Sequence, residues 1–402
     1  MNKANASTNI LVITSWSVHE PLMHTYVLPN IRIIQKITEP STKIFISTFE
    51  KKKIATPQNQ EKIHWIHLSY SNFSFKALIL YVVQIYRLTK LVKKENIAHL
   101  HAFAPVAGTL GLIIKFFTGR KLIIDSWEPH ADCMVESKTW KKNSLAYIML
   151  KFSEKLQCSR AEILIATSKK MPEYALKNLM QTRGKILYRP ACVDLSIMKR
   201  DEARRFQIRS EKNWTDKIVL VCVSKLGGLY LKEDVFRFFR TGIDILGGKI
   251  QVLLISANSS YEITTLSQQY KIPHGQITHI QCNPNEIPMW LSASDIALNP
   301  QHPIPSKRYG TPVKDGEYWA MGLPVIILPD ISDDSEIVLN ENAGVILKSL
   351  SDLDMKTCFE ETLVFLKEHP NHHQLIRQVA EKYRSYELAK KAYAEIYCQA
   401  QC

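Results

Sequence analysis

The chain has 402 residues, enough for two domains of ordinary size, and 46% of them are hydrophobic and 22% charged. This composition excludes a disordered or collagen-like chain, and the longest apolar stretches, residues 78–86 and 110–117, fall well short of the roughly 20 residues that span a bilayer. The first nine residues are polar and indicate no signal peptide, so we expect a soluble intracellular protein.

The excess of positive charge is confined to the first half of the chain. Residues 1–190 carry 28 basic and 12 acidic side chains, a net charge of +16, whereas residues 191–402 carry 24 and 26, a net charge of −2. This asymmetry favours an anionic partner for one domain, and a general solubilising charge is the alternative. The sequence has no recognisable nucleic-acid-binding motif, so we expect no nucleic-acid partner.

Short apolar runs alternate with longer amphipathic stretches through the first half, a pattern typical of βαβ units in a parallel sheet. The predicted strands are residues 9–14, 43–47, 64–68, 97–101, 121–125 and 162–167. The predicted helices are a stretch after residue 21 and residues 75–94, 108–117, 143–157 and 169–178.

The alternation stops at residues 189–214, a polar and charge-rich segment, and then resumes. The predicted strands of the second half are residues 217–223, 250–255, 277–281, 295–298, 324–328 and 344–347, with helical stretches between them and a helical tail from about residue 353. We expect domains at residues 1–200 and 201–370 and a tail, 371–402, that packs back towards the first domain. Ligands are expected where the carboxyl ends of both sets of strands meet.

Residues 305–327 (PSKRYGTPVKDGEYWAMGLPVII) form the most specific motif. Thr311 is predicted to cap a helix whose first residue is Pro312, followed by Val313. The free N–H groups and the positive dipole end of that helix suit a phosphate. Glu317, about one and a half turns further on, can accept hydrogen bonds from a sugar diol, and a capped helix with a chance glutamate is the alternative.

This segment closely resembles the nucleotide-sugar motif in the C-terminal domain of glycosyltransferase family 4. The matching residues are Pro312, Lys314, Glu317, Tyr318, Ala320, Gly322, Pro324, Val325 and Ile326. The resemblance implies that Glu317 binds the ribose hydroxyls of the donor. Many relatives carry another glutamate eight residues earlier, where this chain has Tyr309, so the paired-glutamate pattern is half missing.

The resemblance covers most of residues 9–350 and implies the GT-B architecture, an α/β fold of two Rossmann-like parallel-sheet domains that face each other across a cleft. It implies a retaining hexosyltransferase that moves a sugar from a UDP- or GDP-linked donor to a hydroxyl of a saccharide acceptor, without a metal or other cofactor. The first domain would bind the acceptor and the second the donor. A catalytically weak scaffold of the same fold, binding lipid or a partner protein, is the alternative that Tyr309 favours.

Residues 221–232 (VCVSKLGGLYLK) follow the first strand of the second domain. The adjacent Gly227 and Gly228 permit close backbone approach to an anion, although a plain tight turn is the alternative. Relatives in the family place a diphosphate-binding loop with two basic residues here. Lys225 matches the first of these and is assigned a catalytic role on the leaving diphosphate. Lys232 matches the second more loosely, because the spacing of seven is longer than usual.

The span 125–140 (DSWEPHADCMVESKTW) follows a strand and brings acids, a histidine and two tryptophans together, as sugar sites often do. It resembles the acceptor-side loop of bacterial family-4 enzymes. We therefore select His130 as a catalytic residue that orients the donor sugar or the acceptor, with Glu128 beside it, and a structural histidine is the alternative. Trp16 and His19, after the first strand, are weaker acceptor-side candidates.

His99 and His101 alternate to one face of the strand 97–101, and His101 is a further weak acceptor-side candidate. No metal site is predicted, because His130 and Asp132 have no third ligand nearby and the eight cysteines are scattered without a CxxC pair. The Asp352-Leu-Asp354 sequence is interpreted as the start of a helix, where acidic residues favour the dipole.

The predicted helix 75–94 combines apolar residues at helical spacing with Arg87, Lys90, Lys93 and Lys94 towards its end. A core-packed helix with a solvated basic end is one interpretation. Family members with a basic N-terminal domain commonly act on lipid-linked acceptors of the bacterial cell envelope. We therefore predict salt-sensitive, peripheral binding to anionic lipid on the cytoplasmic face of the membrane.

Overall fold

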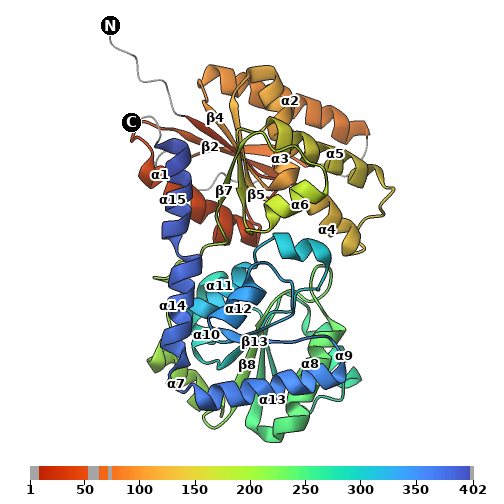
Figure 1. The fold of residues 1–402 in the computed structure, drawn as a ribbon, viewed down its shortest axis with the longest axis vertical. Helices are drawn as coiled ribbons and strands as arrows, with labels where there is room; N and C mark the ends of the chain where they lie inside the picture. The colour runs from red at the N-terminus through yellow and green to blue at the C-terminus, as the bar shows by residue number, and fades with distance from the viewer. Residues whose placement is uncertain (1–8, 53–62, 71–74, 399–402) are drawn as a thin grey trace. The chain divides into compact units, whose positions relative to one another are not determined.

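The computed structural model describes residues 9–52, 63–70 and 75–398 (Figure 1). It contains two compact units, each with its own parallel sheet. The first unit comprises Met1–Pro190 and Glu387–Cys402, and the second comprises Ala191–Tyr386. The division falls before the predicted boundary at residue 200, because the last strand of the first sheet ends at Tyr188. The predicted tail is shared between the units instead of forming a separate segment.

The sheet of the first unit has seven parallel strands in the order β3-β2-β1-β4-β5-β6-β7. They are β1 (Ile10–Ile13), β2 (Ile44–Glu50), β3 (Ile63–Ser69), β4 (His99–Phe103), β5 (Lys121–Trp127), β6 (Ile163–Ala166) and β7 (Lys185–Tyr188). The sequence predicts all of them except β7, an edge strand whose apolar run is only three residues long and whose single buried side chain is Leu187. The strand order reverses between β1 and β4, the kind of position at which α/β proteins bind ligands.

The helices of the first unit cover both faces of this sheet. They are η1 (Met23–Val27), α1 (Leu28–Ile37), α2 (Phe75–Lys94), α3 (Ala104–Thr118), α4 (His130–Glu136), α5 (Leu145–Arg160), α6 (Met171–Lys177) and α15 (Tyr386–Tyr397). Gly111 of α3 lies close to Ala102 and Leu122, whereas α15 contacts His101 and Asp125. Because neighbouring residues of a strand point to opposite faces, α3 and α15 cover opposite faces of the sheet.

A buried charge cluster holds α15 on the first sheet. Asp125 Oδ1 accepts a hydrogen bond from Arg189 Nη2 at 2.5 Å. Asp125 Oδ2 accepts one from the Tyr393 hydroxyl at 2.7 Å and lies 3.0 Å from His101 Nε2. The Tyr397 hydroxyl lies 2.6 Å from His101 Nδ1. Burial raises the pKa of Asp125, but the Arg189 charge and the His101 contact outweigh it, so this pKa lies well below its usual range. The ionised carboxylate therefore requires the groups around it.

The sheet of the second unit has six parallel strands in the order β10-β9-β8-β11-β12-β13. They are β8 (Ile218–Val223), β9 (Ile250–Ile255), β10 (Ile277–Ile280), β11 (Ile296–Leu298), β12 (Val325–Ile327) and β13 (Gly344–Ile346). All six are predicted from the sequence, because most are runs of buried aliphatic residues. The prediction of an α/β fold with two parallel sheets is confirmed.

The helices of the second unit pack around this sheet. They are α7 (Glu202–Glu211), α8 (Glu233–Leu246), η2 (Gly247–Lys249), α9 (Ser260–Gln269), η3 (Pro284–Glu286), α10 (Ile287–Ser292), η4 (Pro305–Tyr309), α11 (Val313–Ala320), α12 (Asp334–Asn340), α13 (Asp352–Glu368) and α14 (His372–Arg384). Part of the charge-rich segment 189–214 forms α7, whose Arg205 and Arg209 pair with Asp295 at 2.5 and 2.9 Å. Its charges therefore anchor a helix at the start of β11.

A second buried charge cluster holds α14 against α11 and α12. Arg384 forms an ion pair with Asp334, and Asn299 Nδ2 donates to both oxygens of Asp315, at 2.8 and 2.7 Å. Burial, and then the charge of Asp334, raise the pKa of Asp315 well above its usual range, so a proton stays between the two carboxyl groups. Gly316 leaves the space that the Arg384 side chain fills.

We expect Tyr393→Phe to lower the free energy of unfolding by about 1.5–3 kcal/mol, because it removes one donor from the ionised, buried Asp125 without changing the ring. Urea unfolding of the full chain measures the change. Tyr261→Phe, on an exposed ring of the second unit, is the control. Equal stability of the two variants would contradict the role given to this cluster.

Candidate functional site

The glycine loop, residues 224–232, follows β8 at the carboxyl edge of the second sheet. Gly227 and Gly228 have φ values of +88° and +66°, which strain any side-chain-bearing residue. The Leu231 N–H donates to the Pro300 carbonyl at 2.7 Å, and Tyr230 forms a bridge with Gln301. The loop is thereby fixed to the segment that runs from β11 towards α11.

Helix α11 begins one residue later than the sequence predicts. Val313 is its first residue and Pro312 is the N-cap, with φ −65° and ψ 122°, so Thr311 does not occupy the capping position. Proline has no side-chain oxygen with which to cap the helix. The N–H groups of the first turn have no acceptor within the helix and remain suited to an anion. Gly322, with φ +73°, follows the end of the helix as predicted.

Glu317, the predicted acceptor of the sugar diol, is buried and ion-paired. Its side chain is 5% exposed, and Lys314 Nζ donates to Oε2 at 2.7 Å across one turn of α11. The next residue, Tyr318, accepts a hydrogen bond from the Val223 N–H at 2.9 Å. This bond fixes α11 to the carboxyl end of β8, beside the glycine loop.

The two lysines of the glycine loop differ in their surroundings. Lys225 is exposed, whereas Lys232 Nζ lies 2.6 Å from Glu262 Oε1. Asn258 Nδ2 donates to Glu262 at 2.9 Å, and Asn258 Oδ1 accepts the Leu226 N–H at 2.8 Å. Neither Asn258 nor Glu262 is predicted from the sequence, although Asn258 closely follows the carboxyl end of β9, where a polar residue signals a ligand-binding edge.

Tyr309, which stands where many relatives have a glutamate, ends the short helix η4. Its side chain is 9% exposed, so the position is filled by a buried aromatic ring. Tyrosine provides no carboxylate, and the donor side of this site therefore contains Glu317 without the second acid of the family pattern.

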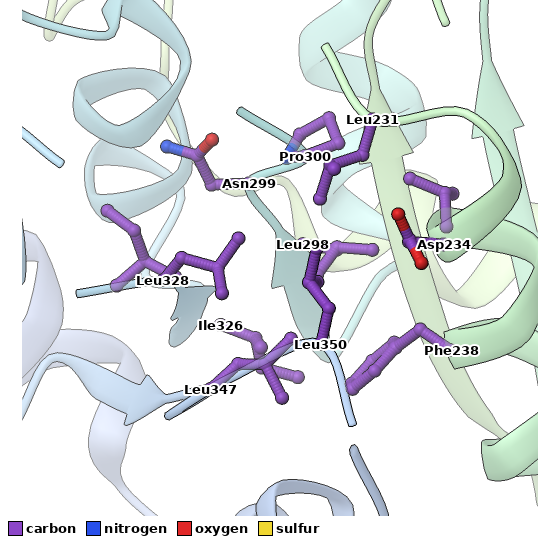
Figure 2. Close-up of a pocket in the computed structure, with 12 residues that line it drawn as sticks. Leu231, Asp234, Phe238, Leu298, Asn299, Pro300, Ile326, Leu328, Leu347 and Leu350 are labelled. Atoms are coloured by element: carbon purple, nitrogen blue, oxygen red, sulfur yellow. The ribbon is translucent and has the colours of Figure 1, made fainter. Parts of the chain in front are cut away.

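Apolar side chains from β11, β12 and the start of α8 surround a small void inside the second unit (Figure 2). Figure 2 shows Leu298, Ile326 and Leu347 close together, with Asn299 and Pro300 nearby. The volume of the void is about 10 Å³, no more than the space one water molecule needs. It is a packing defect of the core, far too small for a nucleotide.

Backbone strain in the first unit is found at the carboxyl ends of β4 and β5. Ala104 follows β4 with φ +68°, and Ser126 in β5 has φ +53°, both unusual for residues with a side chain. The Tyr26 hydroxyl lies 2.7 Å from Ser126 Oγ, and the Ser126 N–H donates to Asp125 Oδ1 at 2.6 Å. Strain of this kind gathers at functional sites, and here it lies just before His130.

His130 and Glu128 lie together at the start of α4. The His130 Nδ1 atom is 3.6 Å from Glu128 Oε1, and the two side chains are 29% and 37% exposed. Asp132 is engaged elsewhere, because Lys151 Nζ, Tyr174 and Tyr147 donate to it at 2.8, 2.5 and 3.1 Å. Burial raises the pKa of Asp132, but the bonds from Lys151 and Tyr174 prevail and lower it.

Glu154 of α5 fixes the start of α4 through a hydrogen bond. It is buried, and its Oε1 accepts the Ala131 N–H at 2.8 Å. Burial raises the pKa of Glu154 to about 7, although Lys151 and His130 act to lower it and Asp132 to raise it. The residue next to His130 is therefore bonded to a carboxyl group that titrates near neutral pH.

His101 does not line an accessible site, contrary to its selection from the sequence. Its side chain is fully buried between Tyr397 and Asp125, and its contact with Tyr397 joins residues 296 positions apart.

His19 is exposed and Trp16 is half-buried in the loop after β1, and the Val18 N–H of this loop donates to Glu50 at 2.9 Å. Burial also lowers the pKa of His99 to about 4.

Residues 9–52, 63–70 and 75–398 contain no group of three or more His, Cys, Asp or Glu side chains able to hold a metal ion. Asp352 and Asp354 lie in the first turn of α13, where Ser351 caps the helix by accepting the Asp354 N–H at 3.1 Å, so the helix-start interpretation is confirmed. None of the cysteines in the described part of the chain forms a disulfide. None of its helices has the length and apolar character needed to cross a bilayer.

No protein-family model and no curated protein sequence match this chain. Solved structures match over nearly its whole length. Sucrose-phosphate synthase from Thermosynechococcus elongatus is 13% identical, with 98% of this chain and 99% of that chain covered and a TM-score of 0.75. WaaG, a glycosyltransferase involved in lipopolysaccharide biosynthesis, is 12% identical, with 96% and 99% covered and a TM-score of 0.73. Anabaena HepE in complex with UDP-glucose is 13% identical, with 96% and 98% covered and a TM-score of 0.70.

At these identities the similarity establishes the fold. The chain has the GT-B architecture, as the sequence predicts, with two α/β units and a helical C-terminal region. The activity of the chain does not follow from the fold alone and has to be argued from its own residues.

Glu154→Gln tests the titration beside His130. The pKa of Glu154 in the folded protein, about 7, lies above its ordinary value of 4.5, so the stability it contributes is present below pH 4.5 and is lost as the pH rises through 7. We expect the native protein to lose about 2–3 kcal/mol between pH 5 and 8 from this group, and Glu154→Gln to remove that loss. Urea unfolding at both pH values, with the exposed Glu20→Gln as control, measures it. The same pH dependence in Glu154→Gln would contradict the assignment.

Proposed function

We propose that the protein transfers a sugar from a nucleoside-diphosphate sugar to a hydroxyl group of a saccharide acceptor, with retention of configuration at the transferred carbon. The observation that carries this proposal is the joining of the glycine loop, the segment 299–302 and α11 at one edge of the second sheet. The loop provides the N–H groups of two glycines and two lysines, and α11 provides a helix N-terminus and a carboxylate. HepE, which shares the fold, has been solved with UDP-glucose.

In this proposal the diphosphate lies between the glycine loop and the start of α11. The N–H groups of Gly227 and Gly228, those of the first turn of α11 from Val313 onward, and the ammonium groups of Lys225 and Lys232 stabilise the negative charge that grows on the leaving diphosphate. Lys232 exchanges its Glu262 partner for a phosphate oxygen. We propose that these cations and N–H groups suffice without a divalent metal, and turnover in the presence of EDTA tests this.

Glu317 and Lys314 recognise the ribose of the donor. The paired carboxylate keeps one oxygen, Oε1, outside the 2.7 Å contact between Lys314 and Oε2. A vicinal diol can donate to such a carboxylate without breaking the ion pair. Because Glu317 is already held in place, little conformational entropy is lost when the nucleotide binds.

The first unit supplies the acceptor side of the proposed reaction. His130 and Glu128 are adjacent and partly exposed, and both can form hydrogen bonds with a sugar hydroxyl and so orient it. Trp16 and His19 offer an aromatic face and a polar group after β1. His101 has no part in it, because it is buried in the cluster that binds α15.

We further propose that the acceptor is a lipid-linked glycan of the bacterial cell envelope and that the protein acts at the cytoplasmic face of the membrane. The net charge of +16 on residues 1–190, against −2 on the remainder, supports an anionic surface as the partner of the first unit.

Two measurements test the activity. A screen of UDP- and GDP-sugars for thermal stabilisation identifies the donor, because a ligand that binds only the native state raises its stability. Release of free nucleotide from the stabilising donor then reports hydrolysis or transfer. Stabilisation without any nucleotide release, with every acceptor supplied, would favour the catalytically weak scaffold, and the absence of both would contradict the proposal.

We expect Glu317→Gln to weaken donor binding by about 10- to 150-fold, because a charged acceptor of the ribose hydroxyls is lost. Calorimetric titration with the donor measures the affinity. Glu341→Gln is the matched control, since Glu341 is also a lysine-paired carboxylate of the second unit, 2.7 Å from Lys382. An unchanged affinity in Glu317→Gln would remove the central assignment of α11.

We expect Lys225→Ala to lower kcat roughly 100-fold while donor affinity changes much less, because the charge on the leaving diphosphate is greatest in the transition state. Lys249→Ala, an exposed lysine before β9, is the control. If only KM rises in Lys225→Ala, the lysine binds the ground state and its assigned role in catalysis is wrong.

A further inference from the structure

Large apolar side chains are exposed along three neighbouring helices of the first unit. Helix α3 packs against both α2 and α5, so the three helices are neighbours in the first unit (Figure 1). The exposed apolar residues are Leu78, Ile79, Val82, Val83 and Tyr86 of α2, Phe116 and Phe117 of α3, and Leu145, Ile148, Met149, Phe152 and Leu156 of α5. We call this set the three-helix face. Its members recur every three or four residues in α2 and α5, so each helix presents one apolar stripe.

A groove between α3 and α5 lies within the three-helix face. Its volume is about 680 Å³, and most of its lining residues are apolar, among them Leu112, Phe116, Met149 and Phe152. Phe116 is 83% exposed and Phe152 63% exposed, values far from those of core residues. Soluble proteins seldom leave so many large apolar residues together at the surface unless a partner covers them.

The charged residues of the three helices themselves are almost all positive. Helices α2, α3 and α5 contain five, one and three lysines or arginines, nine in total, and one acid, Glu154, which is buried. The exposed cations are Arg87, Lys90, Lys93, Lys94, Lys155 and Arg160. Apolar stripes flanked by cations complement a surface that has apolar depth and negative phosphates. A second copy of the same face would bring these six exposed cations opposite six others, so charge disfavours a dimer here.

We propose that the three-helix face docks on an anionic lipid bilayer. Phe116, Phe152 and their neighbours enter the boundary between head groups and acyl chains, and the flanking lysines and arginines bind lipid phosphates. The proposal rests on the proposed function for the lipid-borne acceptor, but the docking surface itself involves no donor residue. It extends the predicted basic contact of α2 to an apolar surface that includes α3 and α5.

An apolar contact changes the expected response to salt. A purely electrostatic contact through the basic end of α2 is lost when salt screens the charges. Burial of the aromatic and aliphatic side chains of the three-helix face does not depend on ionic strength in this way. Binding to anionic vesicles is therefore expected to weaken at high salt and to persist in part.

Co-sedimentation of the full chain with vesicles tests the proposal. We expect binding to phosphatidylcholine–phosphatidylglycerol vesicles and much weaker binding to phosphatidylcholine alone. Phe116→Ser with Phe152→Ser is expected to weaken binding by roughly tenfold or more. Tyr261→Ser with Leu353→Ser, which removes equally exposed residues of the second unit, is the matched control and leaves binding unchanged. Circular dichroism confirms that each variant is folded.

Insertion is tested separately with Phe152→Trp and acyl chains that carry bromine. We expect extra quenching of tryptophan fluorescence relative to the native chain, and no extra quenching in Tyr261→Trp. Absence of binding to anionic vesicles, equal binding of the serine variant and its control, or a concentration-dependent dimer that the serine variant abolishes would overturn the proposal. Donor binding is measured without vesicles. Absence of donor binding would contradict the proposed function but not membrane docking, and absence of vesicle binding would contradict docking but not the proposed function.

Discussion

The carboxyl edge of the second sheet is held together by hydrogen bonds between segments that are distant in the sequence, and the candidate donor site depends on them. The Val223 N–H donates to Tyr318, the Leu231 N–H to Pro300, and the Leu226 N–H to Asn258. Each bond uses a backbone group that would otherwise be left without a partner as β8 ends and the chain turns. The glycine loop and α11 are thereby fixed before any ligand binds, and the cost of ordering them falls on folding instead of binding.

The sequence predicts most of the fold, because each strand of the second sheet is a short apolar run and α11 carries a specific motif. It predicts side-chain pairs within one helix less well, and pairs between separate elements not at all. Lys314 and Glu317 are three residues apart on a helix, so their ion pair is readable in principle. The contacts of Lys232 with Glu262 and of His101 with Tyr397 join separate elements, and no local pattern reveals them. Strand periodicity alone therefore led to the wrong selection of His101 as a residue of an accessible site.

The two units use charge in opposite ways. In the second unit charges are paired, as in Arg205 and Arg209 with Asp295, and they fix helices to the sheet. In the first unit one buried pair, Arg189 with Asp125, does similar work, while the exposed cations of α2 and α5 stand beside apolar side chains. This difference accounts for the net charge of +16 on residues 1–190 against −2 on residues 191–402. A sequence count detects the excess, but only the structure shows that it borders an apolar surface.

In the proposed donor site, the ion pair between Lys232 and Glu262 is expected to favour anions of high charge. Glu262 forms an ion pair with Lys232 and raises the pKa of that lysine, and in the proposed site a phosphate oxygen takes the place of Glu262. An incoming group has to replace a carboxylate that is already present, so a singly charged anion gains little from the exchange. A diphosphate gains more, because it also reaches the N–H groups of the glycine loop and of α11, which Glu262 does not contact. The ion pair is therefore expected to select against weaker anions.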